Sequence, residues 1–431
     1  MTILNPPTLT VQSAPATLRA LQTRRSLLLG LKAMRDELGD IFSLSFPGFK
    51  AIVLSGPEAA HFTYVQARNS LDWRTEDDPV TGLLRHGVLV EDDESHDVLR
   101  RDMLPYLHRQ KVDDYFEAFI RRTDQICETW NLDQTMDMLV EMRRVALLIL
   151  METLFNVDIT PDMDRLWKPI IHTIKYISPG AWLLWRNIPR PGFRREIREL
   201  DEYIFRLIET QRGINHSGDN LLNHLIDSGM SDDLIRDQIL TMLIAGHDTS
   251  TALLTWAIYL LASHPLAMQR AQDEVDSVMH GKVPTHELIR SLVYLEQVIN
   301  ETLRLYPPIH VSNRHMKEDL EFKGYRIPSG YRLMFSIYLS HHDNNSWQEA
   351  ERFDPSRFAP GVRHRPYTFI PFGGGPRNCI GAAFAQVEAK AVLSRLLQRY
   401  NFTLLQPNVR LYMGATLEPR PGLLVQVTPR R

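Results

Sequence analysis

The sequence contains very little cysteine: Cys127 and Cys379 are the only two among its 431 residues. Two thiols cannot form the disulfide framework of a small secreted domain, and they cannot supply the thiolates of a zinc cluster. Such scarcity fits a reducing compartment, and we therefore expect a cytoplasmic protein.

The sequence also lacks an excess of either charge. Its 49 basic and 52 acidic residues give a formal net charge of −3, which provides no electrostatic footprint for nucleic acid. We find no internal repeat and no low-complexity linker. A hydrophobic fraction of 44% leaves room for a sizeable core. Length alone suggests two to three domains, although single large folds also reach this size.

No uninterrupted apolar run has the length of a membrane span. The most apolar long segment, residues 234–262, has His247 and Asp248 near its middle, where lipid tolerates charge least. Residues 23–29 resemble a twin-arginine export signal, but the apolar run ends at Lys32 and no small-residue cleavage site follows. An amphipathic first helix within residues 1–30 explains the same pattern better than export.

The order of sequence patterns predicts a mainly α fold with a smaller β-rich portion. Helical spacing dominates from Pro15 to about Leu305. Short extended runs and turns follow, and one further helical pattern runs from about Ile380 to Tyr400. Other helical patterns cover residues 112–131, 136–154, 194–210 and 266–279, and a short extended stretch covers residues 51–54.

One predicted helix is exceptionally long. Ser231 is a candidate N-cap, two aspartates occupy the first turn, and Pro265 ends the pattern. At 1.5 Å per residue this helix would span roughly 45 Å, enough to cross a domain. The polar residues 247–251 at its midpoint should therefore lie near the molecular centre. Burying Asp248 there costs several kcal/mol unless its carboxylate is paired, hydrated or functional.

A glycine-rich approach precedes Cys379. A thiolate that binds iron needs N–H donors and positive charge near the sulfur. Glycines 373–375 would let the backbone approach a flat ligand and present such donors, and the helix after Cys379 adds its positive end. The alternative is a buried structural thiol. Neither G-x-x-x-x-G-K-[ST] nor G-x-G-x-x-G occurs in this segment, which argues against a phosphate loop.

These residues resemble the haem-binding signature of the cytochrome P450 family, F-x-x-G-x-R-x-C-x-G. The positions are filled by Phe372, Gly375, Arg377, Cys379 and Gly381. The resemblance extends from about residue 40 to the C-terminus and implies that Cys379 is the axial ligand of the iron in haem b. It also implies the P450 fold, a triangular helical domain around a buried haem with a long central helix. We expect residues 1–431 to form one such domain without a fused reductase.

Three further residues match a structural pattern of the family. Glu301 and Arg304 fit E-x-x-R, and Arg357 lies in a segment similar to F-x-P-x-R-F. An acid and a base three residues apart on a helix are usually a solvated pair worth about 0.2 to 0.5 kcal/mol. The resemblance instead implies a buried network of these three side chains on the haem side of the core.

Haem carries two propionates, which need cationic partners. The resemblance assigns that role to His96 and Arg100, spaced i and i+4 on one helix, and to Arg314 and Arg377. A surface or capping histidine is the alternative for His96 taken alone.

Residues 245–249 fit the family pattern [AG]-G-x-[DE]-T. Reduction of dioxygen needs protons, which a buried acid beside a hydroxyl can deliver. The resemblance therefore implies that Ala245 lies against the haem, that Gly246 leaves room for oxygen, and that Asp248 and Thr249 relay protons. Alternatively, Thr249 bonds back to a helix carbonyl and Asp248 caps a kink. Having both residues favours oxygen-dependent monooxygenation over direct use of peroxide.

The predicted function is hydroxylation or epoxidation of a lipophilic small molecule such as a fatty acid or terpenoid. The alternatives are a haem-thiolate peroxygenase or isomerase and a non-catalytic haem sensor. Residues 176–191 fall where the family carries a lid, and their aromatic residues and arginines suit a mouth that could rest on a membrane surface, or an ordinary packed loop. Pocket walls are expected from residues 83, 84, 88, 89, 244, 245, 309, 311, 415 and 416.

Electrons must come from another protein, because the sequence has no flavin or nicotinamide fingerprint. We expect a ferredoxin or flavodoxin with its reductase. Arg101, Arg109 and Lys111 lie on or after the helix of His96, and they are predicted to dock this acidic partner. A solvated charged face is the alternative.

Overall fold

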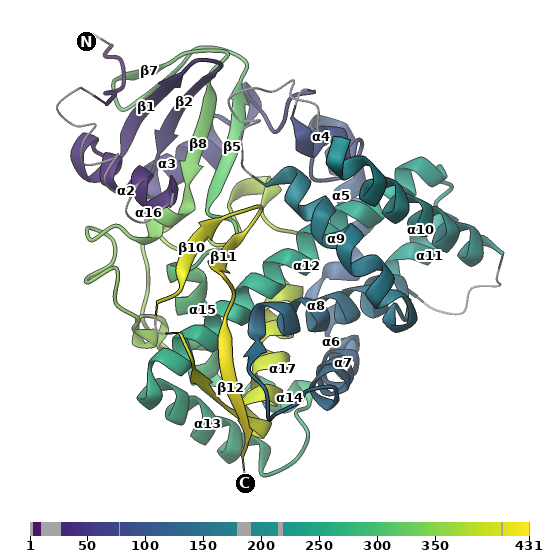
Figure 1. Ribbon diagram of the computed structural model, residues 1–431. Helices are drawn as coiled ribbons and strands as arrows, with labels where there is room; N and C mark the ends of the chain where they lie inside the picture. Colours follow the sequence, from purple (N-terminus) through teal and green to yellow (C-terminus); the bar gives the residue numbers. More distant parts are fainter. Residues whose placement is uncertain are drawn as a thin grey trace.

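The computed structural model describes residues 3–9, 27–76, 78–178, 191–213, 219–406 and 408–430. Helices fill most of the molecule, and small sheets lie at its margins (Figure 1). The predicted mainly α fold with a smaller β-rich portion is therefore confirmed.

The helices match the periodic segments of the sequence with shifts of a few residues at their ends. The predicted helix over residues 112–131 is wrong in extent, because this region contains two helices that meet at Tyr115. The first of them begins directly after His108, whose backbone is extended (ψ 147°). The helices are α2 (Leu27–Leu38), α3 (Pro57–His61), α4 (Pro79–Leu84), α5 (Asp93–Leu107), α6 (Arg109–Asp114), α7 (Phe116–Glu128), α8 (Met138–Phe155), α9 (Met163–Ile177), α10 (Arg194–Arg212), α11 (Leu221–Asp227), α12 (Asp232–Ser263), α13 (Pro265–Met279), α14 (His286–Ile289), α15 (Val293–Leu305), α16 (Ile337–His341) and α17 (Ala382–Arg399).

The strands bring distant parts of the chain together. The five-stranded sheet has the order β1-β2-β8-β5-β3, with β2 and β8 parallel, so residues 41–72 pair with residues 311–336. The strands are β1 (Ile41–Phe46), β2 (Phe49–Leu54), β3 (Leu71–Asp72), β4 (Met136–Asp137), β5 (Val311–Met316), β6 (Leu320–Phe322), β7 (Tyr325–Ile327), β8 (Arg332–Ser336), β9 (Tyr400–Leu404), β10 (Arg410–Met413), β11 (Leu417–Arg420) and β12 (Leu424–Pro429). Short 3-10 or π turns are η1 (Phe62–Gln66), η2 (Arg68–Ser70), η3 (Thr160–Asp162), η5 (Pro191–Phe193), η6 (Pro355–Phe358) and η7 (Gly375–Arg377).

The predicted long central helix is confirmed as α12, which crosses the middle of the molecule (Figure 1). Ser231 caps it by accepting a hydrogen bond from the Leu234 amide at 3.3 Å, and α13 begins at Pro265. Helix α12 packs against α8, α10, α15 and α17, which explains why so few of its apolar positions reach solvent.

The described helices differ from membrane spans. No single helix there has the length and apolar composition of a span; α12 and α13 reach that composition only as a pair bent by 112°.

The predicted Glu301–Arg304–Arg357 network is confirmed. Arg304 donates two hydrogen bonds to the Glu301 carboxylate, at 2.7 and 2.8 Å, and both side chains are fully buried. Arg357 Nε lies 3.4 Å from Glu301 Oε1. Arg304 also donates to the carbonyls of His341 and Ala350. Because a buried charge needs such partners, this network joins α15 to η6 and to the segment that precedes it.

Candidate active site

The glycine-rich segment before Cys379 is a tight loop. The Cys379 amide donates to the Phe372 carbonyl at 2.8 Å. Gly373 and Gly375 have φ angles of +71° and +67°, a region that favours glycine. A Cβ at Gly375 would lie 2.3 Å from the Tyr64 carbonyl oxygen, so the close contact with η1 also requires glycine there. The loop ends at Gly381, where α17 begins at Ala382.

The two cysteines differ in their exposure to solvent. Cys127 is buried, and burial raises the pKa of its thiol to about 12, which makes it an inert core residue. Cys379 is exposed, so the alternative of a buried structural thiol does not describe it. The surrounding protein raises the pKa of Cys379, whereas the Gly381 amide and the Arg100 guanidinium lower it. These two groups favour the thiolate that an iron ligand must be.

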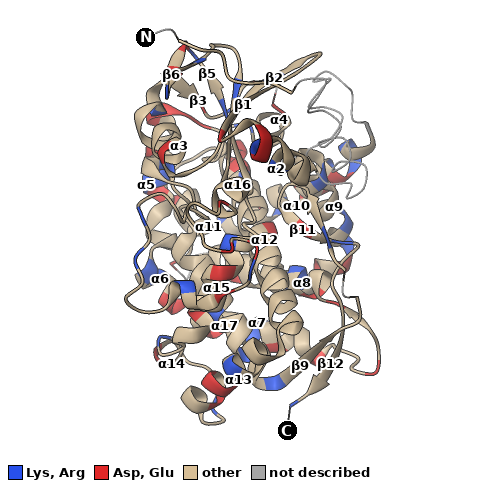
Figure 2. Ribbon diagram, turned by 90° about the vertical axis from the view of Figure 1, so that its left-hand side faces the viewer, with Lys and Arg blue, Asp and Glu red and all other residues tan. Residues whose placement is uncertain are grey.

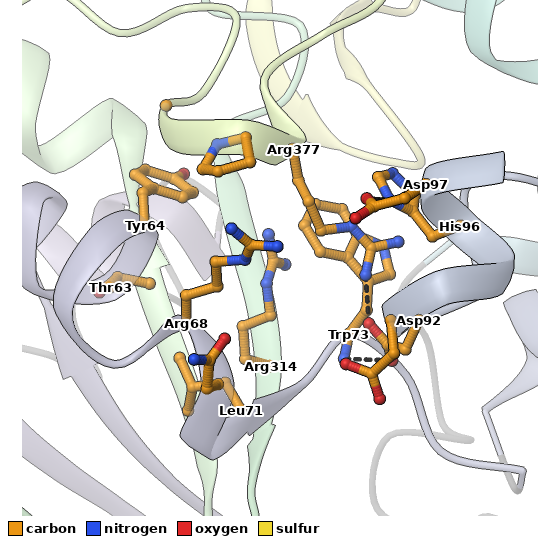
Figure 3. Close-up of a pocket in the computed structure, with 14 residues that line it drawn as sticks. Thr63, Tyr64, Arg68, Leu71, Trp73, Asp92, His96, Asp97, Arg314 and Arg377 are labelled. Atoms are coloured by element: carbon orange, nitrogen blue, oxygen red, sulfur yellow. Dashed lines mark hydrogen bonds and ion pairs between the residues drawn. The ribbon is translucent and has the colours of Figure 1, made fainter. Parts of the chain in front are cut away.

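A cationic cavity lies beside the cysteine loop. Figure 3 shows Arg68, Arg314 and Arg377 pointing into it, with His96 at its edge. Its lining includes Gly374 and Pro376 of the cysteine loop. Asp92, Asp93 and Asp97 also line the cavity, so the three arginines for which we call it the cationic cavity share it with acidic side chains next to the predicted ligand of iron.

Trp73 arranges two of these arginines. The Arg314 guanidinium lies 3.2 Å from the centre of the Trp73 ring, and that of Arg377 lies 4.3 Å from it. Arg377 is paired with Asp92, which also accepts from the Trp73 amide at 2.9 Å (Figure 3). Cation–π contacts hold both guanidinium groups in place, although only one of them has an acid partner.

Arg314 fits an anionic ligand. It is buried, and among the described residues its recorded hydrogen bond is to the Asn313 carbonyl at 2.6 Å, with no carboxylate partner. The pKa of Arg314 is lowered to about 9, chiefly by burial and in part by the neighbouring cations Arg74 and Arg377, against the opposing effects of Tyr64 and Asp92. A buried guanidinium in such surroundings would gain from a carboxylate. The residues present therefore fit haem: Arg314 and Arg377 would hold its propionates, and Cys379 would bind its iron.

The other predicted propionate partners have contacts of their own. His96 is buried with its Nδ1 2.9 Å from an Asp97 oxygen, and it lines the cavity. Arg100 donates twice to Asn378, to the carbonyl and to the side-chain oxygen, both at 2.9 Å. Arg100 is thus placed beside Cys379 and is not among the cavity-lining residues, so its propionate contact stays a prediction.

At the centre of α12, the residues of the five-residue pattern face different neighbours. A Cβ at Gly246 would lie 2.7 Å from Leu150 Cδ1, so the glycine allows close packing with α8. The structure thus gives Gly246 a packing reason that the sequence did not suggest. Thr249 donates to the Ala245 carbonyl at 2.7 Å, which is the back-bonded arrangement of the alternative interpretation. Its proton-relay role remains a prediction, as does contact of Ala245 with haem.

Asp248 belongs to a polar network and does not cap a kink. Its Oδ2 accepts from the Thr416 hydroxyl at 2.7 Å, and its Oδ1 lies 3.6 Å from Arg143 Nη2 without a hydrogen-bond partner. Arg143 also pairs with Glu418, whose other oxygen is 3.4 Å from Arg420 Nη2. Arg420 is 42% exposed, so a chain of charged groups leads from the buried Asp248 to solvent.

The neighbouring histidine is neutral. His247 Nε2 lies 3.0 Å from the Arg143 carbonyl, and burial lowers the pKa of His247 to about 4. With Nε2 donating to that carbonyl, the ring anchors α12 to α8 and adds no charge beside Asp248.

Several site residues were missed by sequence reasoning. Arg68 and Trp73 belong to no motif that the sequence revealed. Arg143 gave a weak signal as a basic residue within the apolar helical pattern of residues 136–154, and Glu418 gave none. Their importance comes from contacts with residues far away in the chain.

The predicted docking residues and the predicted lid have different outcomes. Figure 2 shows lysine and arginine positions along α5 and α6. Arg101 and Arg109 are exposed and have no ion pair among the described residues, whereas Lys111 pairs with Asp219 at 3.0 Å and with Asp114 at 3.6 Å. Residues 179–190, most of the predicted lid, lie outside the described residues.

Comparisons with known proteins show the family of the whole chain. A family model described as cytochrome P450 matches residues 7–424. A putative cytochrome P450 139 of Mycobacterium tuberculosis is 31% identical, covering 90% of this chain and 95% of the relative. LUTEIN DEFICIENT 5 of Arabidopsis thaliana is 30% identical, covering 91% and 72%, and cyclooctatin synthase of Streptomyces melanosporofaciens is 29% identical, covering 81% and 78%.

A solved structure supports the fold. Cyanobacterial CYP120A1 with retinoic acid bound has a TM-score of 0.86 and 24% identity, and the match covers 100% of both chains. With the extent of the family match and the five signature residues, which include the exposed Cys379, these findings show that the chain is a haem-containing monooxygenase of the cytochrome P450 family.

Proposed function

We propose that this P450 hydroxylates or epoxidises a long lipophilic molecule of the terpenoid or carotenoid type. The observation that carries the oxygen-dependent mechanism is the network around Asp248, because it connects a buried acid on α12 to solvent through charged groups. Relatives named for lutein deficiency and cyclooctatin synthesis, and a neighbour with retinoic acid bound, support a long isoprenoid substrate.

The protein would hold its cofactor from two sides. Cys379 would bind the iron, and Arg314, Arg377 and His96 would bind the propionates. When bound, haem supplies the redox chemistry that activates dioxygen. The segment 372–381 keeps the sulfur in place through the bond from the Cys379 amide to the Phe372 carbonyl.

Asp248 and Thr249 would move protons. The Asp248 Oδ1 atom has no hydrogen-bond partner in the described structure, so it can accept a proton from water while Oδ2 stays fixed by Thr416. Burial raises the pKa of Glu418, and the negative charge of Asp248 raises it further. Glu418 can therefore take up a proton at the outer end of the network and pass it inward past Arg143. For its part in the relay, the Thr249 hydroxyl must turn away from the Ala245 carbonyl.

Substrate class is tested by spectral titration of the haem protein. Retinoic acid, β-carotene and a C20 terpenoid should each shift the haem spectrum, because such ligands displace water near the iron. A panel in which only small polar compounds shift the spectrum would contradict the proposal.

The reaction itself is tested with oxygen and an electron donor. We expect oxygen-dependent product, and we expect Thr249→Ala to divert most electrons to hydrogen peroxide while substrate affinity stays within about twofold. Product formed equally well from added peroxide without a reductase would favour the peroxygenase alternative. A normal thiolate-type carbon monoxide spectrum without any product from the panel would favour a haem sensor.

The remaining expectations belong to the same proposal. We propose that residues 1–431 form one P450 domain and that an acidic ferredoxin or flavodoxin, with its own reductase, docks on the exposed Arg101 and Arg109. Cytoplasmic location and contact of residues 176–191 with a membrane surface stay predictions.

A further inference from the structure

Three consecutive polar residues near the start of α12 are buried: Arg236, Asp237 and Gln238 are each no more than 1% exposed. A helix normally turns such side chains to solvent, because burial without partners is costly. Their partners are therefore informative about what this part of the helix does. Most of them lie in one segment of the chain, residues 83–88, about 150 positions earlier in the sequence.

Each of the three side chains binds the backbone of residues 83–88. Gln238 accepts from the Val88 amide and donates to the His86 carbonyl, both at 2.9 Å. Asp237 accepts from the His86 amide at 3.2 Å, and Arg236 donates to the Leu83 carbonyl at 2.9 Å. Because these bonds hold backbone atoms, they fix the path of the main chain over residues 83–88 and do not depend on which side chains the segment carries.

The same residues are braced by other elements. Arg236 Nε donates to Asp201 on α10 at 2.8 Å, and its Nη1 donates to the Asp237 carboxylate at 2.8 Å. The clamp, Arg236 with Asp237 and Gln238, thus joins α12, α10 and the end of α4. Its geometry cannot change without breaking charged hydrogen bonds inside the protein.

Steric contact brings the segment directly onto α12. A Cβ at Gly87 would lie 1.9 Å from the Thr241 hydroxyl and 3.1 Å from the Asp237 carbonyl. Thr241 is one helical turn before Ala245. On its other side, the Gly87 carbonyl accepts from the Val90 amide at 2.9 Å, and the chain continues to Asp92 at the cationic cavity. The segment therefore lies between the part of α12 just before the predicted oxygen site and the cavity predicted to hold the propionates.

We propose that Arg236, Asp237 and Gln238 fix residues 83–88 as a rigid wall of the substrate pocket, so that selectivity among lipophilic substrates is set before any substrate binds. The role in selectivity rests on the proposed function, whereas the rigidity of the wall does not. The three residues are positioning residues, because they act through the backbone of residues 83–88.

The test uses the full haem-loaded protein and two matched variants. Gln238→Met removes two of the clamp's four bonds to the segment and keeps side-chain length. Gln272→Met is the control, since Gln272 is also buried and donates to the Tyr400 carbonyl and the Asn401 side chain on β9. We expect amide hydrogen exchange over residues 83–90 to become roughly tenfold faster in Gln238→Met only. Unchanged exchange, or an equal increase in both variants, would overturn the clamp.

Selectivity is measured as the ratio of the dissociation constants of retinoic acid and dodecanoic acid, from spectral titrations. Gln238→Met should change this ratio at least about threefold, as expected for altered apolar contacts, and Gln272→Met should not. Faster exchange with an unchanged ratio would overturn the role of the wall in selectivity. If neither acid shifts the spectrum of the unaltered protein while the exchange difference persists, the lipophilic-substrate proposal is wrong and the clamp stands.

A second pair of variants covers the case in which Gln238→Met fails to fold. Gly87→Ala should loosen residues 83–90 because its methyl group meets the Thr241 hydroxyl. The double change Gly87→Ala with Thr241→Ala removes the hydroxyl and should restore slow exchange. Absence of this rescue would contradict the direct contact between the segment and α12.

Discussion

At the scale of single residues, the centre of the molecule holds acids that would be costly to bury alone. Asp248 shares Arg143 with Glu418, and Glu388 on α17 is 1% exposed with a hydrogen bond from Ser250, the residue after Thr249. The cost of burial is lowered in two different ways: Asp248 is paired with a cation, and Glu388 keeps its proton.

Glu388 makes stability fall as pH rises. Burial raises the pKa of Glu388 to about 8, so its folded-state pKa exceeds the unfolded value near 4.5. Its contribution to stability is complete below pH 4.5 and is lost as pH rises toward 8. Glu388→Gln should therefore gain stability relative to the unaltered protein, by about 3 kcal/mol between pH 5 and pH 8. Urea unfolding at several pH values measures this difference.

The exposed Glu321→Gln serves as the control for this comparison. It should leave the pH dependence of the free energy of unfolding unchanged. The buried His247, His310, His341 and His342 contribute a slope of opposite sign at low pH, because burial lowers the pKa of each. These histidines contribute equally in the unaltered protein and in both variants. If the free energy of unfolding of Glu388→Gln depended on pH in the same way as that of the unaltered protein, Glu388 would not be protonated in the folded protein.

Glu418 is expected to matter for turnover rather than for substrate affinity. With Glu418→Gln, Arg143 would pair with Asp248 alone and hold its carboxylate in the ionised form. Proton transfer should slow, and we expect kcat to fall several-fold, on the order of the effect of losing one proton-transfer group. Spectral titration should give an unchanged substrate dissociation constant, and the solvent deuterium isotope effect on kcat should increase. Equal loss of affinity and turnover would indicate a merely structural role.

At the scale of elements, α12 is the frame of the site. Its first turns carry the clamp on residues 83–88, and its middle carries Ala245 to Thr249. Along its length α12 packs against α8 and β11. Helix α5 contributes differently, because it carries His96 toward the cationic cavity and Arg101 toward solvent. One short helix thus connects cofactor binding with the predicted docking face.

Docking on α5 and α6 predicts a salt-dependent reduction rate. Reversing charge with Arg101→Glu and Arg109→Glu should slow reduction by an acidic ferredoxin about tenfold or more at low salt, and the salt dependence should weaken. Lys111→Glu should have a smaller effect, since Lys111 already pairs with Asp114 and Asp219. Stopped-flow reduction at several ionic strengths distinguishes these variants, and unchanged rates in the double variant would exclude this face.

At the scale of the whole molecule, two buried arginines near the site have opposite electrostatic surroundings. Arg304 is paired with Glu301, whereas Arg314 has no carboxylate partner among the described residues. The first arginine belongs to the stability of the polypeptide. The second is a cost to the polypeptide that the cofactor's propionates would offset.

Substitution of these arginines by methionine should therefore have opposite effects. Arg304→Met leaves Glu301 buried with the more distant Arg357, at 3.4 Å, as its remaining cation, and it should destabilise the protein by roughly 3 to 5 kcal/mol with or without haem. Arg314→Met should stabilise the haem-free protein by about 1 kcal/mol or more, because it removes a buried charge, and it should speed haem loss. Urea unfolding and haem transfer to apomyoglobin measure both. Destabilisation of the haem-free form by Arg314→Met would contradict the assignment.

Much of this protein is determined by its sequence alone, because the relevant signals are local. The ten-residue signature around Cys379, the cap and periodicity of α12 and the spacing of Glu301 and Arg304 all involve residues close in the chain. Backbone conformation and helix faces depend on such neighbours. The family, the central helix and the buried Glu301 network could therefore be predicted, and Cys379 stays the predicted ligand of the iron.

Only the tertiary structure decided the partners of the buried charges. Asp248 bonds Thr416 from 168 positions away, Trp73 contacts both Arg314 and Arg377, and Gln238 holds the backbone of His86 and Val88. These pairs arise where helices and loops pack, and no spacing in the sequence encodes them. The physical reason is that a buried polar group must find its partner among whatever the fold brings within about 3 Å.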